Sequence, residues 1–101
     1  MIITRWQAQS QPNTQVLSQI LATEGIEPVQ EIFPAQKKVR DHRHTMAEIR
    51  YVLKGELLFN ISGNQFLLRA GDRVEIPANT RHSYSNNSQE DCISLCGYRI
   101  V

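Results

Sequence analysis

From residue 29 onward, short runs of alternating apolar and polar residues follow one another, and turn-forming residues separate them. Alternation with a period of two is typical of strands that bury one face. The separating segments carry glycine, asparagine and proline, which favour turns. Several short strands at such close spacing predict an all-β sandwich or barrel. After a first period-two stretch over 29–33, the expected strands span 36–42, 48–54, 56–62, 65–69, 73–76, 82–86 and 92–100.

One segment ahead of these strands has helical periodicity. Between residues 13 and 24, apolar side chains recur at a spacing that places them on one stripe of a helix: Val16, Leu17, Ile20 and Leu21. Asn13 or Thr14 can cap the start of this helix, and Gly25 suits a left-handed end. We expect the stripe to pack on a sheet.

Length and charge narrow the functional classes. The 101 residues suit one domain spanning residues 1–101. Eleven basic and ten acidic residues give a net charge of +1, which argues against nucleic acid as the main partner. The apolar stretches are too short to span a bilayer, and the first ten residues lack the apolar core of a signal peptide. These features predict a cytoplasmic protein that binds neither nucleic acid nor membrane.

The two cysteines, Cys92 and Cys96, lie four residues apart in the last expected strand. In an extended strand their Cα atoms would be about 13 Å apart, which is too far for a disulfide. We expect both thiols to act as small buried hydrophobic groups.

The segment over residues 41–55 contains side chains with metal-binding character. His42 and His44 are two residues apart, so on a strand they point to the same face. Glu48 opens the next strand, where hairpin pairing would bring it beside these imidazoles. His82, the only other histidine, begins a later strand. Three imidazoles and a carboxylate suit a divalent transition metal such as zinc, iron, nickel or manganese.

With these residues the sequence resembles the cupins. The first cupin motif, G-x5-H-x-H-x3,4-E-x6-G, is matched by His42, His44, Glu48 and Gly55. The second motif, G-x5-P-x-G-x2-H-x3-N, is matched by Gly71, Pro77, His82 and Asn86. Two motif glycines are replaced, by Gln36 and Asn79. Asparagine tolerates a left-handed backbone better than other residues that carry a side chain.

The resemblance implies a double-stranded β-helix, or small jelly-roll barrel, that holds one divalent transition metal (Fe, Ni, Mn or Zn). It assigns the metal ligands as His42, His44, Glu48 and His82. Four protein ligands on a six-coordinate ion would leave two positions for a bidentate oxygen ligand. A zinc site with three histidines is an alternative, in which Glu48 lies beside the ligands. Another alternative is that some histidines only line a polar barrel interior.

The strand that carries Glu48 also carries an arginine on the same face. Glu48, Arg50 and Val52 share one side of the strand over residues 48–54. When Glu48 points into the barrel, Arg50 does so too, and a buried guanidinium needs a partner. Arg50 then either binds an anionic or enolate ligand at the metal, or forms a structural ion pair with Glu48 or Asp41.

The other side of that strand is apolar. Ile49, Tyr51 and Leu53 would face outward from the barrel and need a cover. The helix over residues 13–24, a neighbouring strand or a second subunit can provide it. Cupins commonly dimerise through such outer faces, so the resemblance implies a homodimer.

Tyr84 lies on the same face of its strand as His82 and Asn86. Its hydroxyl would then reach the pocket, and together with Arg50 it would place two polar groups beside the metal. The alternative is an aromatic ring that only fills the barrel. Arg50 and Tyr84 are therefore the candidate catalytic residues.

Within the cupins, the EIRY sequence at residues 48–51 looks most like the acireductone dioxygenases, whose first motif runs HxHxxxEIRY. The segment LSQILATEGIEP also resembles their short helix and glycine-isoleucine step before the barrel. The resemblance implies a metal-dependent, dioxygenase-like enzyme that acts on a chelating ene-diol or oxyacid. The alternatives are a cupin isomerase and a non-catalytic module that binds a sugar or a small organic acid.

Overall fold

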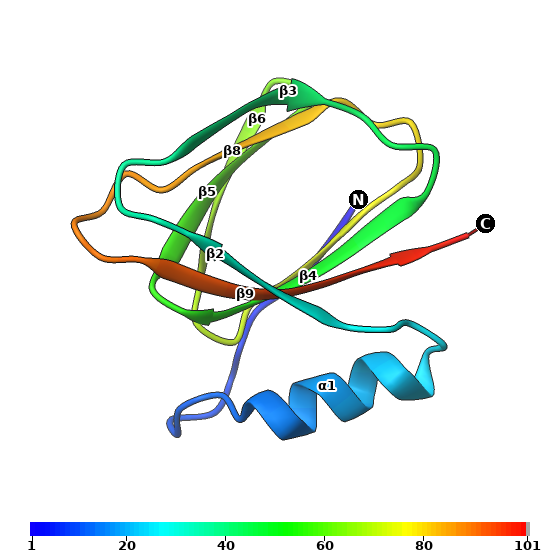
Figure 1. Cartoon of the computed structure of the whole chain (residues 1–101), viewed down its shortest axis with the longest axis vertical. Helices are drawn as coiled ribbons and strands as arrows, with labels where there is room; N and C mark the ends of the chain where they lie inside the picture. Colours follow the sequence, from blue (N-terminus) through cyan, green and yellow to red (C-terminus); the bar gives the residue numbers. More distant parts are fainter. Residues whose placement is uncertain (101) are drawn as a thin grey trace.

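Two antiparallel sheets face each other and enclose the core of a barrel (Figure 1). This computed structural model describes residues 1–100, which contain nine strands and one helix. One sheet has five strands, in the order β1 (Ile2–Thr4), β7 (Arg73–Ile76), β4 (Ala47–Lys54), β9 (Cys92–Arg99) and β2 (Val29–Phe33). The other has four, in the order β3 (Lys38–His42), β8 (His82–Ser85), β5 (Glu56–Ile61) and β6 (Asn64–Arg69). The expected all-β jelly-roll barrel with one short helix is confirmed.

Each strand expected from the sequence is present, with its ends shifted by at most two residues. The sequence does not predict β1, because three residues are too few to show a period of two. β1 pairs with the outer edge of β7, and the chain after it is held by Asp72. The Asp72 carboxylate accepts hydrogen bonds of 2.8 Å from the guanidinium of Arg5 and from the N–H of Trp6. A side chain far away in the sequence therefore fixes this short strand.

The two positions where motif glycines are replaced both have a left-handed backbone. Gln36 has φ 66° and Asn79 has φ 62°. The expectation for Asn79 is thus confirmed, and Gln36 takes the same conformation at a cost that its side chain offsets. The Gln36 amide donates hydrogen bonds to the carbonyl oxygens of Asn87 and Ser88, at 3.2 and 2.8 Å.

The main apolar core lies between the two sheets. Val52 of β4 and Phe59 of β5 are fully buried there, each on the inward face of its strand. The buried members of this core are Phe33, Val52, Leu57, Phe59, Ile61, Leu68, Val74, Ile76, Tyr84 and Cys92. Both cysteines are buried and free, as the sequence predicts.

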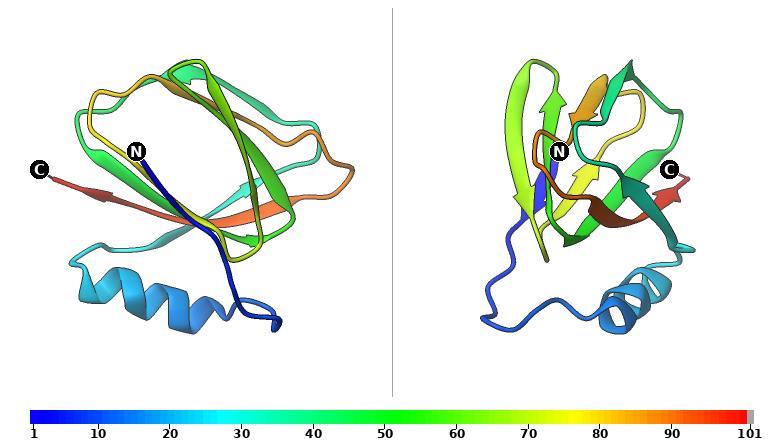
Figure 2. Two further views of the ribbon diagram at one scale, coloured as in Figure 1. Left: turned by 180° about the vertical axis from the view of Figure 1, so that it is seen from behind. Right: turned by 60° about the vertical axis from the view of Figure 1, so that its left-hand side comes forward.

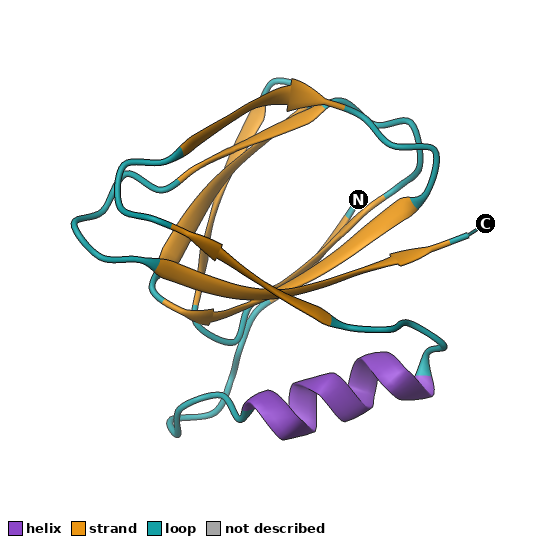
Figure 3. Ribbon diagram, in the orientation of Figure 1, coloured by secondary structure: helices purple, strands orange, loops and turns teal. Residues whose placement is uncertain are grey.

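α1 (Thr14–Thr23) runs along the outside of the five-stranded sheet (Figure 2). Figure 3 shows this helix as the single purple element beneath the orange strands. Asn13 caps its start, because Oδ1 accepts hydrogen bonds from two N–H groups of the first turn. Gly25, with φ 78°, takes the left-handed conformation that follows the helix end. No helix within residues 1–100 has the length and apolar character needed to cross a membrane.

Only half of the apolar stripe of α1 packs on the sheet. Leu17 and Leu21 are buried, whereas Val16 and Ile20 are 50% and 38% exposed. Residues 17 and 21 are one turn apart and share the line of contact, while residues 16 and 20 lie to its side. Together with Ile26, the helix covers the outer side of β4, as one of the three expected covers. The homodimer implied by the resemblance stays a prediction.

Candidate metal centre

His42 and His82 come from neighbouring strands of the four-stranded sheet. They are direct partners in the register of β3 and β8, next to a bulge between Val39 and His42. Because His42 ends β3 and His82 begins β8, both lie at the same end of this strand pair. Their ring centroids are 4.3 Å apart.

His44 reaches the same place from a loop, since β3 already ends at His42. The carbonyl oxygen of His44 accepts a 2.6 Å hydrogen bond from the N–H of Asn79, in the loop before β8. The His44 ring lies 4.7 Å from that of His42 and 5.1 Å from that of His82. The two motif segments therefore hold each other in place, and the histidines share a face although only His42 is in the strand.

Glu48 enters from the opposite sheet. It is the second residue of β4, which pairs with β7 and β9 and not with β3. The expected hairpin between the histidine strand and the glutamate strand is therefore wrong. The loop between β3 and β4 crosses from one sheet to the other, so Glu48 faces the imidazoles across the barrel. Within the barrel its carboxylate is buried, with 1% of the residue exposed.

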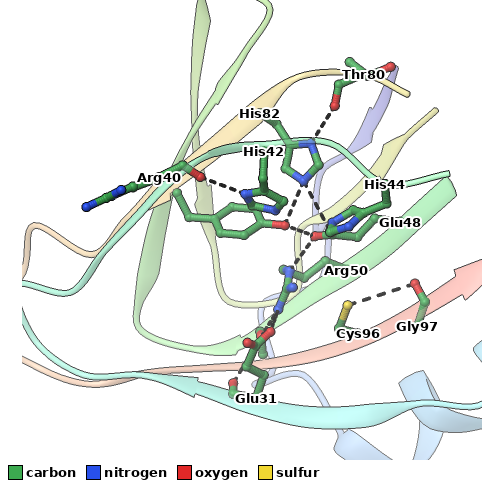
Figure 4. Close-up of polar contacts among 12 residues, drawn as sticks. Glu31, Arg40, His42, His44, Glu48, Arg50, Thr80, His82, Cys96 and Gly97 are labelled. Carbon is green, nitrogen blue, oxygen red and sulfur yellow. Dashed lines mark hydrogen bonds and ion pairs between the residues drawn. The ribbon is translucent and has the colours of Figure 1, made fainter. Parts of the chain in front are cut away.

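These four side chains converge inside the barrel (Figure 4). One potential ligand atom from each lies within 4.8 Å of all the others: His42, His44, Glu48 and His82. His82 is buried, while His42 and His44 are partly exposed, so the cluster is open to solvent on the His44 side. All four residues that the sequence proposes as ligands are thus brought together.

Hydrogen bonds to backbone carbonyls orient two of the imidazoles. His42 Nδ1 lies 2.7 Å from the carbonyl oxygen of Arg40, and His82 Nδ1 lies 2.8 Å from that of Thr80. A carbonyl oxygen can only accept, so Nδ1 carries the proton in both rings. Nε2 of each ring is then the nitrogen that faces the cluster, and in the neutral ring it carries the lone pair that can bind a metal.

The two oxygens of Glu48 have different surroundings. Oε2 accepts hydrogen bonds from the Tyr84 hydroxyl and, at 3.0 Å, from Nε of Arg50. Oε1 lies 3.1 Å from Nε2 of His44 and 3.3 Å from Nε2 of His82. The hydrogen bonds from Tyr84 and Arg50 therefore fix Oε2. Oε1 faces the imidazoles and is the one oxygen of this carboxylate that is placed to bind a metal.

The Glu48 carboxyl is ionised at neutral pH. Burial by itself raises its pKa, but the hydrogen bond from His82, the charge of Arg50 and the hydrogen bond from Tyr84 lower the pKa to about 2. Burial lowers the pKa of His82, yet the hydrogen bonds with Glu48 and with the carbonyl oxygen of Thr80, together with the charge of Glu48, outweigh this and raise the pKa above its ordinary value. The carboxylate is thus the fixed negative charge of the site.

Arg50 lies next to Glu48 on the inner face of β4, and only 1% of its surface is exposed. Its Nη1 donates to Oγ of Ser94 at 2.7 Å and is paired with Oε1 of Glu31 at 2.8 Å. Its guanidinium carbon lies 5.1 Å from the ring centroids of both Phe33 and Tyr84, in cation–π contact. Of the alternatives that the sequence leaves open for Arg50, the ion pair with Glu48 is present, at 3.0 Å between Nε and Oε2, and ligand binding stays a prediction.

The alternative prediction, in which Arg50 pairs with Asp41, is wrong. Asp41 is exposed and lies 3.9 Å from Nη1 of Arg81, outside the barrel. It occupies the position before His42, so in the alternation of β3 its side chain points away from the interior.

The ring of Tyr84 fills the barrel and its hydroxyl reaches the candidate ligands, while its catalytic role stays a prediction. Its ring is part of the apolar core and packs edge-on against Phe33 and Phe59, at 5.6 and 4.8 Å between centroids. Its hydroxyl donates to Glu48 and lies 3.0 Å from Nε2 of His82. Burial raises the pKa of this phenol well above 10, so it remains a proton donor.

The sequence does not single out three residues at this site: Glu31, Ser94 and Tyr98. Glu31 and Ser94 contact Arg50, and the ring of Tyr98 lies 5.3 Å from that of His44. The alternation of β2 already places Glu31 on the face of buried Phe33. Alternation alone does not say which strands lie side by side, and so the contact with Arg50 could not be foreseen.

Three imidazole nitrogens and one carboxylate oxygen fit a divalent transition metal. The donors come from both sheets and from the loop after β3, and they lie within 4.8 Å of one another. Hydrogen bonds hold the second atom of His42, His82 and Glu48. The fold and this site together define a small β-barrel protein whose interior could hold a metal.

The comparison with protein families agrees with this. Residues 29–98 match the model of the cupin domain, so the chain belongs to the cupin family. The acireductone dioxygenase of Bacillus licheniformis is 37% identical over 57 residues, which cover 52% of this chain and 31% of that protein. An uncharacterized protein of Methanocaldococcus jannaschii is 33% identical over 66 residues, covering 64% of this chain and 53% of that protein. The chain thus matches about a third to a half of the length of these relatives.

Solved structures show the same fold. An RmlC-like cupin from Shewanella frigidimarina superimposes with a TM-score of 0.61 at 24% identity, covering 71% of this chain and 65% of that one. The DMSP lyase DddQ from Ruegeria pomeroyi gives a TM-score of 0.66 at 25% identity, covering 73% of this chain and 38% of that one.

Proposed function

We propose that this protein binds one divalent transition metal (Fe, Ni, Mn or Zn) through His42, His44, Glu48 and His82. The observation that carries the proposal is the convergence of four donor atoms within 4.8 Å of one another. Two imidazoles have Nδ1 bound to a carbonyl oxygen, which leaves Nε2 for the metal. Hydrogen bonds to Oε2 of Glu48 leave Oε1 as its ligand atom.

For the reaction, we propose a dioxygenase-like enzyme that acts on a chelating ene-diol or oxyacid. The likeness of residues in the barrel to acireductone dioxygenases supports it. A metal at this site would supply Lewis-acid polarisation of oxygen ligands. Arg50 would stabilise negative charge on the ligand from its buried, fixed position. Tyr84 would keep Glu48 in place, and the rings around Arg50 would exclude water.

One observation favours the alternative, a non-catalytic cupin that binds a sugar or an organic acid. The donors of Arg50 and Tyr84 are directed at Glu48, Ser94 and Glu31, which are groups of the protein itself. Side chains whose donors are directed at other groups of the protein can shape a binding site without taking part in a reaction.

The first experiment measures metal content. Untagged protein purified without chelator or nickel resin is analysed by mass spectrometry, beside His82→Ala and Ser83→Ala. Ser83 is the next residue of β8 and faces away from His82. We expect near-stoichiometric iron, nickel, manganese or zinc in the wild type and in Ser83→Ala, and its loss in His82→Ala. A wild type that takes up none of these metals when they are added would overturn the proposal.

The second experiment separates enzyme from binding module. Oxygen uptake is measured with an acireductone, in the wild type loaded with Fe²⁺ or Ni²⁺ and in Arg50→Lys. Lysine keeps the charge but loses the fork of donors, so we expect the rate to fall on the order of 100-fold while metal content is kept. No uptake by any metal form of the wild type would favour the binding module.

A further inference from the structure

A cavity of about 320 Å³ lies against the inward faces of β2 and β9. Val29 and Glu31 line it from β2, and Cys96 and Tyr98 line it from β9. Val29 is opposite Cys96 in the register of these two strands, and both side chains are apolar. The cavity therefore offers an apolar wall with two carboxylates, those of Glu27 and Glu31, and only Glu31 is paired with Arg50.

This cavity lies next to residues that contact the candidate metal centre, on the side of His44 and on the side of Arg50. Tyr98 packs against the ring of His44, with 5.3 Å between centroids. Glu31 is paired with Arg50, and Cys96 is the cross-strand partner of Arg50 in β4 and β9. A small molecule in the cavity would therefore have Tyr98 between it and the imidazole of His44, and Glu31 between it and Arg50. Figure 4 shows Glu31 beside Arg50, with the imidazoles on the other side of Arg50.

The two carboxylates that neutralise Arg50 are held very differently. Glu48 has a side chain that is 1% exposed and four polar neighbours. Glu31 has a side chain that is 51% exposed, and its one ion pair within residues 1–100 is with Arg50. It also sits on β2, which is the edge strand of its sheet and pairs with β9 alone. Glu31 can thus turn out to solvent without breaking any other contact of its carboxylate.

Nη1 of Arg50 needs an acceptor when Glu31 turns away. Without Glu31 the guanidinium keeps the ion pair with Glu48 through Nε, but Nη1 loses its charged acceptor at a buried position, which is unfavourable. An incoming carboxylate can take the place of Glu31 at Nη1 and keep the charge balance. A neutral molecule cannot, and would have to bind with Glu31 still in position.

We propose that Glu31 is a displaceable internal counter-ion, which a small organic carboxylate with an apolar body replaces at Arg50 when it enters the cavity. The inference rests on the proposed function, since it names the ligand class and the place of its anionic group beside the metal centre. Glu31 is thereby a specificity-determining residue. It competes with every ligand for Arg50, selects for anions, and lowers their apparent affinity by the fraction of time that it occupies the guanidinium.

The test uses metal-free protein, so that it does not depend on whether a metal binds. Butyrate and its neutral isostere butyramide are titrated at constant ionic strength, and the Nε–H signal of Arg50 and the Cδ signals of the glutamates are followed by NMR. In the wild type we expect butyrate, and not butyramide, to shift the signals of Arg50 and Glu31. The Cδ signal of Glu27, an exposed carboxylate that lines the same cavity, should stay in place.

Variants sharpen the test. Glu31→Gln removes the competing charge, and we expect it to bind butyrate about fivefold more tightly than the wild type. Glu27→Gln makes the same chemical change without an ion pair to Arg50, and its affinity should stay within about twofold. Equal affinity of Glu31→Gln and the wild type, or an equal response to butyramide, would overturn the proposal. The wild-type titration decides the matter on its own if Glu31→Gln does not fold.

Metal binding gives the separate readout for the proposed function. Isothermal titration of Mn²⁺ or Zn²⁺ into Glu31→Gln should match the wild type, because Glu31 contacts none of the four candidate ligands. If metal binding fails in both proteins while butyrate still displaces Glu31, the proposed anion site is supported and the proposed metal centre is overturned. If metal binds and butyrate does not, the reverse holds.

Discussion

The two faces of β4 are built in opposite ways. On the inner face, Glu48 and Arg50 place two opposite charges inside the barrel, each 1% exposed. On the outer face, Ile49 and Tyr51 lie in an apolar layer under α1, with Leu95 of the neighbouring strand. One strand thus contributes a buried ion pair to one side and a hydrophobic contact to the other.

This difference between the two faces of β4 separates residues that stabilise the fold from residues that form the candidate site. Burying an ion pair returns little net stability, because desolvation of both charges offsets their attraction. Burying an isoleucine under a helix contributes in proportion to the apolar area removed from water. The apolar residues therefore stabilise the fold, on the outer face under α1 and at Val52 in the main core, whereas the two buried charges of the inner face are explained by the candidate metal centre that they hold.

The largest expected effect on stability comes from removing only one partner of the buried ion pair on the inner face. Glu48→Leu leaves Arg50 with Glu31 as its single carboxylate partner, and we expect unfolding in urea to show a loss of about 3–5 kcal/mol. The double variant Glu48→Leu/Arg50→Met removes both charges and should recover at least about 2 kcal/mol of this loss. Neither protein should retain metal. A double variant as unstable as the single one would show that the pair itself stabilises the barrel.

The outer face gives the second prediction. Ile49→Ala opens a cavity beneath α1 and should lower the free energy of unfolding by about 2–4 kcal/mol, while the folded protein keeps its metal content. Ile20→Ala is the control, because this residue belongs to the same helix and is 38% exposed. Its effect on urea unfolding should stay within about 0.5 kcal/mol. Loss of metal in folded Ile49→Ala would mean that the two faces are coupled.

The smallest effect concerns the ion pairs at the rim of the outer face. The Glu24 carboxylate accepts two hydrogen bonds of 2.6 Å from Arg73 and one of 2.9 Å from Arg99. The Arg73 guanidinium carbon in turn lies 5.4 Å from the ring centroid of Tyr51. The bond from Arg73 lowers the pKa of Glu24 below its ordinary 4.5, although burial opposes this.

A lowered pKa in the folded state means that Glu24 contributes stability above pH 4.5, and that this contribution is lost as the pH falls through the folded-state pKa. Glu24→Gln should therefore cost up to about 1 kcal/mol at pH 7 and progressively less below pH 4.5. Thermal melts of both proteins across this range measure the difference. Glu27→Gln, in which an exposed carboxylate is replaced, is the control and should change stability at pH 7 by less than about 0.5 kcal/mol. A difference for Glu24→Gln that stays constant across the pH range would contradict the assignment.

Some of the site follows from local sequence and some does not. His82 and Tyr84 share a face because residues two apart on any strand do so, and Glu48 and Arg50 are linked in the same way. The contact of Glu48 with the histidines, by contrast, does not come from a hairpin. It comes from the facing of two sheets, which no local pattern describes.

The sequence by itself determined eight of the nine strands, the helix with a cap at Asn13 or Thr14, and the four candidate ligands, because strand alternation, capping and metal affinity depend on residue type and short spacing. Only the tertiary structure decided which strands became neighbours. It placed Glu31 of the edge strand at Arg50 and Asp41 outside the barrel, and it gave α1 the outer face of β4. Pairing between distant strands depends on the packing of the whole core, and for that reason the counter-ion of Arg50 could be recognised only in the folded chain.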